Sequence, residues 1–497
     1  MSLIRISNLT FAYEGSCDTV FDRASVQIDT DWRLGLIGRN GRGKTTLLRL
    51  LAGELPHEGQ ISASTAFTYF PFPIKEPQRA LHAVLKELSP EAQEWEVLRE
   101  LSLLEVEEAA LERPFAALSG GEQVKALLAA LFLRPGEYLL IDEPTNHLDL
   151  AARERISAYL RRKSGFLLVS HDRQFLDGCV DHILAIRQTG FEVQRGNFSS
   201  WQTNKQRQDA WELAENEKLK KEIRRLDAAA KRTADWSDRT EKGKKGERNS
   251  GLRPDRGFVG HKAAKMMQRS KNIEDRRTAA IEEKSALLHD VETAESLKLF
   301  AEHYPYGRLV EAKGISISYG GKAVFEEVSF SITDGERVAL LGRNGAGKSS
   351  LLRLILGEKV PYNGMLRLGS GLRLSYVAQD TSFLKGELRS FARESGIDET
   401  RFKTILRKLD FSREQLEKDM AQFSGGQKKK VLIARSLCQK AHLYLWDEPL
   451  NFIDVFSRQQ IEKMIEGFAP TMLLVEHDRA FLDRVATKVV ELKRPVC

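Results

Sequence analysis

The sequence predicts an α/β protein in which two copies of one domain are joined by a long antiparallel helical hairpin. Three observations carry this prediction. Four short motifs recur in the same order, each copy holds a strand, a glycine-rich loop and a helix, and two charged stretches without proline lie in the middle of the chain. The expected boundaries are 1–203 for the first domain, 204–300 for the connecting segment and 301–497 for the second domain.

The repeat consists of four motif pairs. GRNGRGKTT at 38–46 returns as GRNGAGKSS at 342–350, and LSGGEQ at 118–123 returns as FSGGQK at 423–428. YLLIDEPTNHLD at 138–149 returns as YLWDEPLNFID at 444–454, and LLVSHD at 167–172 returns as LLVEHD at 473–478. The spacing is nearly constant, since Glu143 follows Lys44 by 99 residues and Glu448 follows Lys348 by 100. This order and spacing indicate a duplicated domain.

The bulk composition is typical of a globular protein with more than one domain. A length of 497 residues, with 41% hydrophobic and 30% charged residues, favours two to three domains. The four cysteines lie far apart and show neither CxxC nor Cys/His spacing, so no zinc site or disulfide framework is indicated. No run approaches 18 consecutive apolar residues. We therefore expect a cytoplasmic protein without a membrane span.

Each copy contains a phosphate-loop motif in a favourable context. The apolar runs RLGLIG and RVALLG lead into GxxxxGK[ST], and leucines at helical spacing follow. Backbone N–H groups and the helix N-terminus attract phosphates, the lysine adds charge, and the hydroxyls of Thr45 and Ser349 can ligate Mg²⁺. The predicted ligands are ATP and Mg²⁺. The candidate residues are Gly38, Asn40, Gly41, Gly43, Lys44, Thr45 and Thr46 in the first copy, and Gly342, Asn344, Gly345, Gly347, Lys348, Ser349 and Ser350 in the second.

Acidic residues follow a second apolar strand in each copy. Asp142 and Asp447 are placed to bind the metal, while the next residues, Glu143 and Glu448, suit a general base that orients the attacking water. His171 and His477 follow a further apolar strand and are candidates to contact the γ-phosphate. A lone histidine is more often structural, but its position in a repeated phosphate-loop domain favours a catalytic role.

The SGG motifs stand before long helical patterns and resemble the signature of ATP-binding cassettes (ABC). The fold class is then two tandem ABC-type P-loop ATPase domains joined by an antiparallel α-helical hairpin linker. In that superfamily each signature faces the phosphate loop of the other domain, which implies a monomer with two intramolecular ATP sites. The first loop would be completed by Ser424 and Gly426, and the second by Ser119 and Gly121. The signature candidates are Ser119, Gly120, Gly121, Ser424, Gly425 and Gly426.

The same resemblance assigns two further positions and exposes one departure. Tyr13 and Tyr319 fit the aromatic residues that stack on adenine, although an aromatic residue in an N-terminal strand is also ordinary core. Gln379 in LSYVAQD fits the glutamine that ABC proteins place near the metal. The first copy reads FTYFPFP, with Phe72 in that place, and phenylalanine can neither ligate Mg²⁺ nor orient water. Equal turnover at the two sites is therefore not expected.

The connecting segment predicts two long helices around a basic tip. Residues 204–236 and 262–297 have apolar residues at helical spacing, and a glycine-bearing loop is expected at about 238–260. Within 231–277, 15 Lys and Arg stand against 7 Asp and Glu. A solvated helix face and a flexible tether are the plain alternatives to a polyanion-binding probe. The candidate RNA contacts are Trp236, Lys242, Lys244, Lys245, Arg248, Arg253, Arg256 and Phe258, of which Trp236 can equally pack between helices.

Tandem cassettes, EPTNHLD and a charged helical linker resemble the ABC-F family, whose members are cytosolic ATPases that act on ribosomes. The resemblance implies binding at the exit-tRNA site, with the linker tip reaching peptidyl-tRNA and the catalytic centre of 23S rRNA. LGLIGRNGRGKTTLLRLL and WDEPLNFIDVF are similar to Lsa-type resistance proteins, which implies protection from lincosamides, streptogramin A and pleuromutilins.

Three other functions compete with ribosome protection. A housekeeping ABC-F translation factor shares every catalytic residue and is the hardest to separate. The ATPase subunit of a drug exporter has no use for a long basic hairpin. A DNA-repair ATPase would be expected to carry zinc modules, which the cysteine pattern does not support. The predicted partner is therefore the ribosome, with neither membrane nor DNA.

Overall fold

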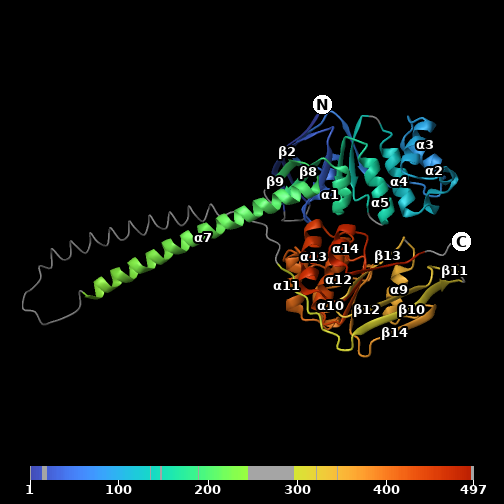
Figure 1. Cartoon of the computed structure of the whole chain (residues 1–497). Coiled ribbons are helices and arrows are strands. Elements are labelled where there is room, and N and C mark those ends of the chain that lie inside the picture. Colours follow the sequence, from blue (N-terminus) through green and yellow to red (C-terminus); the bar gives the residue numbers. More distant parts are fainter. Residues whose placement is uncertain are drawn as a thin grey trace, which may run out of the picture. The chain divides into compact units, whose positions relative to one another are not determined.

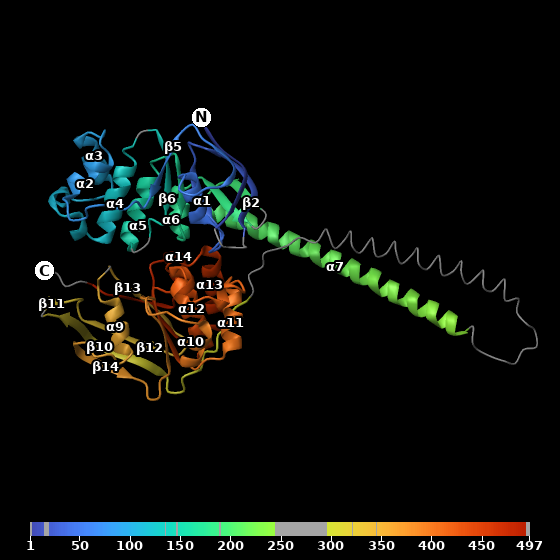
Figure 2. The same cartoon turned by 180° about the vertical axis from the view of Figure 1, so that it is seen from behind.

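The chain forms two units in a computed structural model. The structure describes residues 2–13, 19–134, 136–145, 148–187, 190–243, 296–320, 322–343 and 345–493, with the backbone alone for residues 226–243 and for Lys322. One unit comprises Met1–Trp201 with Ala294–Cys497 and contains both repeats, whereas the other comprises Gln202–Thr293. Figure 1 shows the first repeat in blue to teal and the second in yellow to red, and Figure 2 shows the same elements from behind.

The first repeat, which we call cassette one, contains two sheets. Its central sheet has the order β5-β6-β7-β3-β8-β9 and is parallel except for the antiparallel pair β8 and β9. Its antiparallel sheet has the order β2-β1-β4. The strands are β1 Leu3–Ala12, β2 Thr19–Asp29, β3 Arg33–Ile37, β4 Glu58–Ser62, β5 Ala66–Phe70, β6 Glu137–Asp142, β7 Phe166–Val169, β8 His182–Arg187 and β9 Gly190–Arg195.

The helices of cassette one begin at residues suited to capping. Ser119, Asp149 and Asp172 each accept a hydrogen bond from a backbone N–H in the first turn of the helix that follows. These helices follow the motif segments directly, so the caps fix where the motif residues stand. The helices are α1 Lys44–Leu51, α2 Leu81–Leu88, α3 Glu94–Leu103, α4 Gly120–Leu131, α5 Leu150–Leu160 and α6 Arg173–Cys179, with short 3-10 turns at Glu108–Glu112 and Phe115–Ala117.

The second repeat, cassette two, has the same architecture. Its central parallel sheet has the order β15-β16-β17-β13-β18, and β10 pairs with β11, β12 and β14 in an antiparallel sheet. The strands are β10 Arg308–Tyr319, β11 Lys322–Ala323, β12 Val328–Thr333, β13 Arg337–Leu341, β14 Tyr362–Leu368, β15 Leu374–Val377, β16 Leu443–Asp447, β17 Met472–Val475 and β18 Lys488–Glu491. The helices are α9 Lys348–Ile355, α10 Leu388–Glu394, α11 Glu399–Lys408, α12 Gly425–Cys438, α13 Val455–Phe468 and α14 Arg479–Val485, with 3-10 turns at Gln415–Glu417 and Met420–Gln422.

Each central sheet is buried on both faces, which explains why its strands read as continuous apolar runs. In β6, Tyr138 and Leu140 pack into the core beside the antiparallel sheet, while Leu139 and Ile141 pack into the core beneath the helices. The side chains of β16 alternate between two cores in the same way. The carboxyl ends of β6 and β16 are thereby held rigidly, and the acidic motif residues lie there.

The connecting segment contains one described helix, α7 Phe198–Gly243. It begins within the first unit, where Phe198 and Trp201 are buried and the Trp201 ring centroid lies 6.0 Å from that of Phe456. The prediction of a helical segment is confirmed here, but its predicted end near Trp236 is wrong. No glycine or proline interrupts the helix before Gly243, so Lys242 lies in α7 and not in the predicted tip loop. The second predicted helix and the rest of the tip lie outside the described residues.

Among the residues that the structure describes, no helix is both long enough and apolar enough to cross a bilayer.

Candidate nucleotide-binding sites

The two phosphate loops require glycine immediately before the helix. Gly43 and Gly347 precede α1 and α9 in the left-handed conformation, with φ of 86° and 79°. A Cβ at Gly43 would lie 2.6 Å from a methyl group of Val20 and 2.8 Å from the Phe21 ring, and a Cβ at Gly347 would lie 2.9 Å from Phe325. Both the backbone conformation and the space exclude a side chain, so the loop can pass closely over the strand.

We expect Gly43→Ala to lower the melting temperature more than Gly53→Ala does. Gly53 has a φ of 75° but open space around it, so alanine there adds only backbone strain of about 1 kcal/mol. At Gly43 the clash with Val20 and Phe21 adds roughly 1–3 kcal/mol of overpacking. Thermal unfolding of the two variants measures the difference, and equal shifts would contradict the close packing of the loop.

The motif lysines lie inside their loops. Lys44 Nζ donates to the carbonyl oxygens of Gly38 at 2.9 Å and Arg39 at 3.2 Å. Lys348 Nζ likewise donates to the carbonyl oxygens of Gly342 at 2.8 Å and Arg343 at 3.1 Å. Burial lowers the pKa of both lysines, because a charged ammonium group loses solvation there. A multiply charged phosphate group would reverse that penalty, so the lysines fit a nucleotide.

The aspartates at the ends of β6 and β16 suit a divalent cation. Thr45 Oγ1 donates to Asp142 Oδ2 at 2.8 Å, and burial raises the Asp142 pKa. In the described part of cassette two, both carboxylate oxygens of Asp447 are buried without a hydrogen-bond partner. Burial raises the Asp447 pKa to about 6, although Ser349 lies close enough to oppose that shift. The carboxylate oxygens of both aspartates are thus at least partly buried beside a hydroxyl and a phosphate loop. This arrangement suits a Mg²⁺ ion that the protein and the nucleotide would hold together.

In the first site a histidine faces the glutamate that follows the aspartate. His171 Nε2 lies 3.3 Å from Glu143 Oε1, and both side chains are largely buried. Burial, together with the charge of Asp142, raises the Glu143 pKa to about 8. Burial, with Lys44 nearby, lowers the His171 pKa well below its usual value. The buried surroundings thus favour the neutral form of both side chains.

In the second site the corresponding glutamate has more partners. Glu448 Oε2 accepts hydrogen bonds from Gln379 Nε2 at 2.9 Å and Asn451 Nδ2 at 2.6 Å. His477 Nε2 lies 3.6 Å from Glu448 Oε1. Burial opposes the charge of Glu448, but His477 and Gln379 outweigh it and lower the pKa to about 2. The two glutamates therefore stand in opposite electrostatic environments.

The register of the central sheets shows that Phe72 occupies the position of Gln379. Phe70 pairs with Ile141, the residue before Asp142, and Val377 pairs with Trp446, the residue before Asp447. Phe72 and Gln379 each stand two residues beyond those pairs. Phe72 packs edge-on against Phe70 at a centroid distance of 6.2 Å instead of reaching Glu143. The loss of one hydrogen-bond donor explains part of the difference between the two glutamates.

The two candidate adenine-stacking tyrosines are half-exposed, and the hydroxyl of each lies near a side-chain hydroxyl of the phosphate-loop helix. Tyr13 is 46% exposed and its hydroxyl lies 2.8 Å from Thr46 Oγ1. Tyr319 is 49% exposed and its hydroxyl lies 3.1 Å from Ser350 Oγ. The first turn of each phosphate-loop helix thus positions an accessible ring, which suits stacking on a planar base.

The first phosphate loop contacts cassette two. Asn40 Nδ2 donates to the Phe452 carbonyl oxygen at 3.0 Å, and a Cβ at Gly426 would lie 2.8 Å from Asn40 Nδ2 and 2.3 Å from the Phe452 oxygen. The signature helix α12 therefore starts beside the first loop. Ser424 caps this helix and accepts from the Gln427 N–H at 3.3 Å. The structure thus brings Gly426 to the first phosphate loop, as the resemblance implies.

The second phosphate loop lines a pocket of about 490 Å³. The pocket wall includes Gly345, Lys348, Gln379, Glu448 and His477, together with Leu148 and Arg153 of cassette one. Ser119 and Gly121 are not among its lining residues, although Ser119 caps α4 with Glu122 in the same way as Ser424 caps α12. The volume lies within the usual range for small-molecule pockets.

Several candidate residues lie beyond what the structure describes. Asn344 and the tip residues Lys244, Lys245, Arg248, Arg253, Arg256 and Phe258 fall outside the described residues. For Trp236 and Lys242 the structure gives their place in α7 but not their side chains.

The sequence motifs did not predict one repeated pair of buried arginine–aspartate interactions. Arg153 donates to Asp172 Oδ2 at 3.0 Å and to the Leu148 carbonyl oxygen at 3.1 Å, and Arg458 makes the equivalent bond to Asp478 at 3.1 Å. These buried pairs tie the loop after each glutamate to the segment after each histidine. The aspartates in SHD and EHD, repeated beside the histidines, were the signal that could have revealed them.

This geometry can perform phosphoryl transfer. Each loop would hold a triphosphate through its backbone N–H groups and a lysine, and a hydroxyl and an aspartate would hold Mg²⁺, which would stabilise negative charge during transfer. A glutamate with a histidine can orient water. Within the described ranges, no three His, Cys, Asp or Glu side chains cluster as metal ligands.

Comparison with known proteins places this geometry in a family. A family model described as "ABC transporter" matches residues 21–146 and 325–451, one range in each cassette. The ribosome protection protein VmlR of Bacillus subtilis (strain 168) is 28% identical over 97% of this chain and 85% of its own length. The ATP-binding protein Uup of Caulobacter vibrioides is 30% identical over 95% of this chain and 74% of its own length.

Solved structures support the fold. The archaeal ribosome recycling factor aABCE1, in complex with the ribosomal stalk protein aP1, has a TM-score of 0.63 at 20% identity and covers 97% of this chain and 87% of its own. A structure named RNase-L Inhibitor has a TM-score of 0.62 at 19% identity, with 98% and 87% covered.

The repeated sites and the matched ranges define a class: the protein is a tandem ABC ATPase, an enzyme that hydrolyses ATP. ATPase domains of this class bind ATP, typically with Mg²⁺. Within the class, the relatives that match nearly the whole chain are ABC-F proteins, and this chain belongs to the ABC-F family.

Proposed function

We propose that this protein binds the ribosome at the exit-tRNA site in its ATP-bound state and protects the peptidyl-transferase centre from lincosamides, streptogramin A and pleuromutilins. Support comes from a relative named as a ribosome protection protein, to which the chain is similar over 97% of its length. Ribosome binding would place the protein in the cytoplasm.

The observation that carries the proposal is the insertion of a long, polar helix between two ATP sites. Helix α7 has 46 residues, which corresponds to about 70 Å at 1.5 Å per residue. A helix of that length suits a stiff mechanical element. The segment 231–277, which includes its end, has 15 cationic against 7 acidic residues, as expected of an element that holds RNA phosphates.

The proposal gives each group of residues a role. Glu143 and Glu448 are the general bases, Thr45, Asp142, Ser349, Gln379 and Asp447 hold Mg²⁺, and the phosphate loops with the two signatures bind ATP. The cations of the tip hold rRNA and peptidyl-tRNA. Because Phe72 replaces a glutamine, we assign faster hydrolysis to the second site.

Cell-free translation tests the proposal. Purified protein added to a bacterial translation extract is expected to restore synthesis in the presence of lincomycin, tiamulin or virginiamycin M, because a bound protector lowers drug occupancy at the peptidyl-transferase centre. The yield of a reporter protein measures the effect, and chloride-matched buffer without protein is the control. A housekeeping translation factor would change the yield equally with and without drug, and that outcome would remove the protective function.

A further inference from the structure

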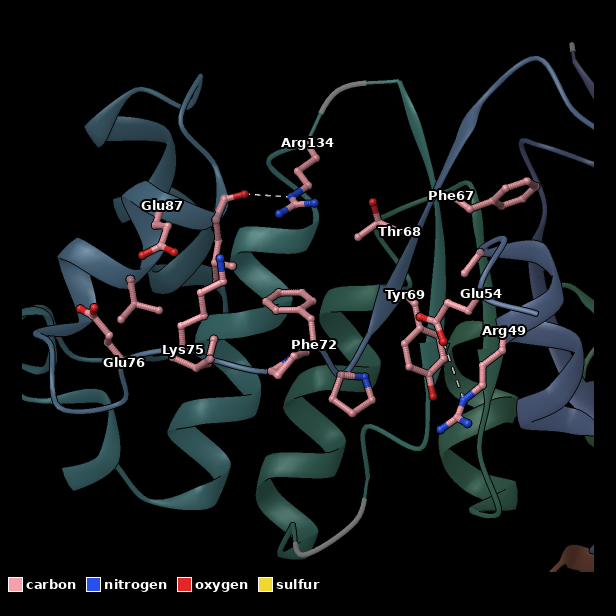
Figure 3. Close-up of a pocket in the computed structure, with 16 residues that line it drawn as sticks. Arg49, Glu54, Phe67, Thr68, Tyr69, Phe72, Lys75, Glu76, Glu87 and Arg134 are labelled. Atoms are coloured by element: carbon pink, nitrogen blue, oxygen red, sulfur yellow. Dashed lines mark hydrogen bonds and ion pairs between the residues drawn. The ribbon is translucent and has the colours of Figure 1, made fainter. Parts of the chain in front are cut away.

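A second pocket lies in cassette one, outside both ATP sites. Its volume is about 500 Å³, and it is lined by the end of α1, strand β5 with the loop that follows, helix α2 and Arg134. Figure 3 shows Phe72 near its middle, with Lys75 and Glu87 on one side and Tyr69 on the other. The size is sufficient for one nucleotide, since pockets for small ligands span roughly 300–1,000 Å³.

The pocket carries aromatic and cationic side chains that cassette two lacks at the same positions. By the register of the central sheets, Phe67 corresponds to Leu374 and Phe72 to Gln379. Counting back from Asp142 and Asp447, Arg134 corresponds to Gln439. The guanidinium of Arg134 lies 5.8 Å from the centroid of the Phe72 ring. Aromatic rings and cations together are the groups that stack unpaired bases and hold their phosphates.

A neighbouring arginine offsets part of the negative charge on the rim. Arg79 does not line the pocket, yet it pairs with Glu87 at 2.7 Å and with Glu76 at 3.6 Å. Arg134 donates to the Leu88 carbonyl oxygen at 2.9 Å, which fixes its direction, and stands 3.7 Å from Glu137. The exposed side chain of Lys75 adds a positive charge that an anion entering the pocket could reach.

One lining residue connects the pocket to the first ATP site. The Tyr69 hydroxyl donates to Asp142 Oδ2 at 3.0 Å, beside the bond from Thr45. A ligand that packs against the Tyr69 ring therefore touches a residue that positions the carboxylate for the cation.

We propose that this pocket binds a single nucleotide, with its base against Phe72 and its phosphate at Arg134 and Lys75, and that binding accelerates hydrolysis at the first ATP site through Tyr69. The nucleotide can belong to an RNA strand or be free, since the chemistry that recognises it is the same. This inference goes beyond the proposed function, because it can be measured without ribosomes.

Photocrosslinking with the full-length protein tests binding. The probes are a hexaribonucleotide that contains 4-thiouridine and free 4-thiouridine monophosphate, with both ATP sites filled by ATPγS. Crosslinks are mapped to the peptide from Phe67 to Lys75, so RNA bound elsewhere on the chain does not contribute. Arg134→Gln, which installs the residue of cassette two, is expected to weaken labelling about tenfold through loss of a charge-assisted contact. Lys75→Ser should also weaken labelling, and it provides a second test in case Arg134→Gln fails to fold.

The control and the outcomes separate the alternatives. Lys86→Gln removes one charge from α2, a helix that lines the pocket, at an exposed position outside the pocket, and should leave labelling unchanged. Labelling by the hexamer alone assigns an RNA strand, and labelling by both probes assigns the nucleotide unit; either result supports the proposal. Labelling that resists both Arg134→Gln and Lys75→Ser overturns it, as does a pocket that is labelled by neither probe and takes a peptide instead.

The connection to hydrolysis is tested separately. In a Glu448→Gln background, which isolates the first site, the hexamer should raise ATP turnover at least about twofold in the parent, whereas Tyr69→Phe should keep the crosslink and lose the stimulation. The matched change Tyr376→Phe should preserve stimulation, since Tyr376 lies in cassette two. Equal stimulation in Tyr69→Phe overturns the coupling. If the protein does not bind ribosomes but the crosslink is intact, the proposed function is contradicted and this inference is not.

Discussion

Replacement of Glu143 and Glu448 by glutamine is expected to stop ATP turnover and to hold the protein on ribosomes. Glutamine keeps the size of each side chain but cannot accept the proton of the attacking water, which removes a contribution of about 10²- to 10⁴-fold. The phosphate loops are untouched, so ATP remains bound and the closed state persists. Phosphate release measures the first effect, and co-sedimentation with 70S ribosomes in ATP measures the second.

Matched substitutions distinguish the loss of the base from the loss of charge. Glu108→Gln and Glu394→Gln remove one exposed carboxylate from each cassette, away from both sites, and should leave turnover and co-sedimentation unchanged. If the double variant at 143 and 448 stays in the supernatant with ATP present, the ribosome is not the partner. Residual turnover close to that of the parent would instead place the general bases elsewhere.

Removal of residues 240–257 is expected to abolish drug protection while ATP binding is retained. The deleted stretch holds six of the candidate RNA contacts, and clustered cations supply most of the affinity for folded RNA through counterion release. The phosphate loops lie far away in sequence, within the other unit. Growth on lincomycin reports protection, and binding of a fluorescent ATP analogue reports the state of the ATP sites.

The control for this deletion keeps the length and removes the charge. A glycine-serine segment of equal length in place of residues 240–257 should also lose protection, because the cations and not the spacing carry the contact with RNA. Drug tolerance equal to that of the parent in either variant would refute the assigned role of the linker.

The fold class was predictable because its signals are local. GxxxxGK[ST] and the acidic pair each occupy a few consecutive residues at the end of an apolar strand, and parallel strands bring such ends to one edge of a sheet. Because the domain is duplicated, each of these motifs is present twice in the chain. The correspondence of Phe72 with Gln379 also follows from sequence, since it depends only on the residue count along one strand.

Contacts between distant residues could not be predicted in this way. The bond from Tyr69 to Asp142 joins positions on neighbouring strands, and the ion pair of Arg39 with Asp410 joins the two cassettes. Both contacts depend on the direction of the side chains in the folded chain, which hydrophobic periodicity does not predict. The end of α7 was misplaced for another reason: charged residues propagate a helix well, so the helix continues past Trp236 to at least Gly243.

The buried indole of Trp201 has a consequence for how the two cassettes can move relative to the start of α7. It belongs to the first turns of α7, yet its ring rests on Phe456, at the start of a helix of the other ATPase half. A shift between the cassettes during ATP use would have to be accommodated at this aromatic contact as well as at the Arg39–Asp410 ion pair, because both join the two cassettes. Because the ring packs against Phe456, a displacement of α13 would directly disturb the first turn of α7.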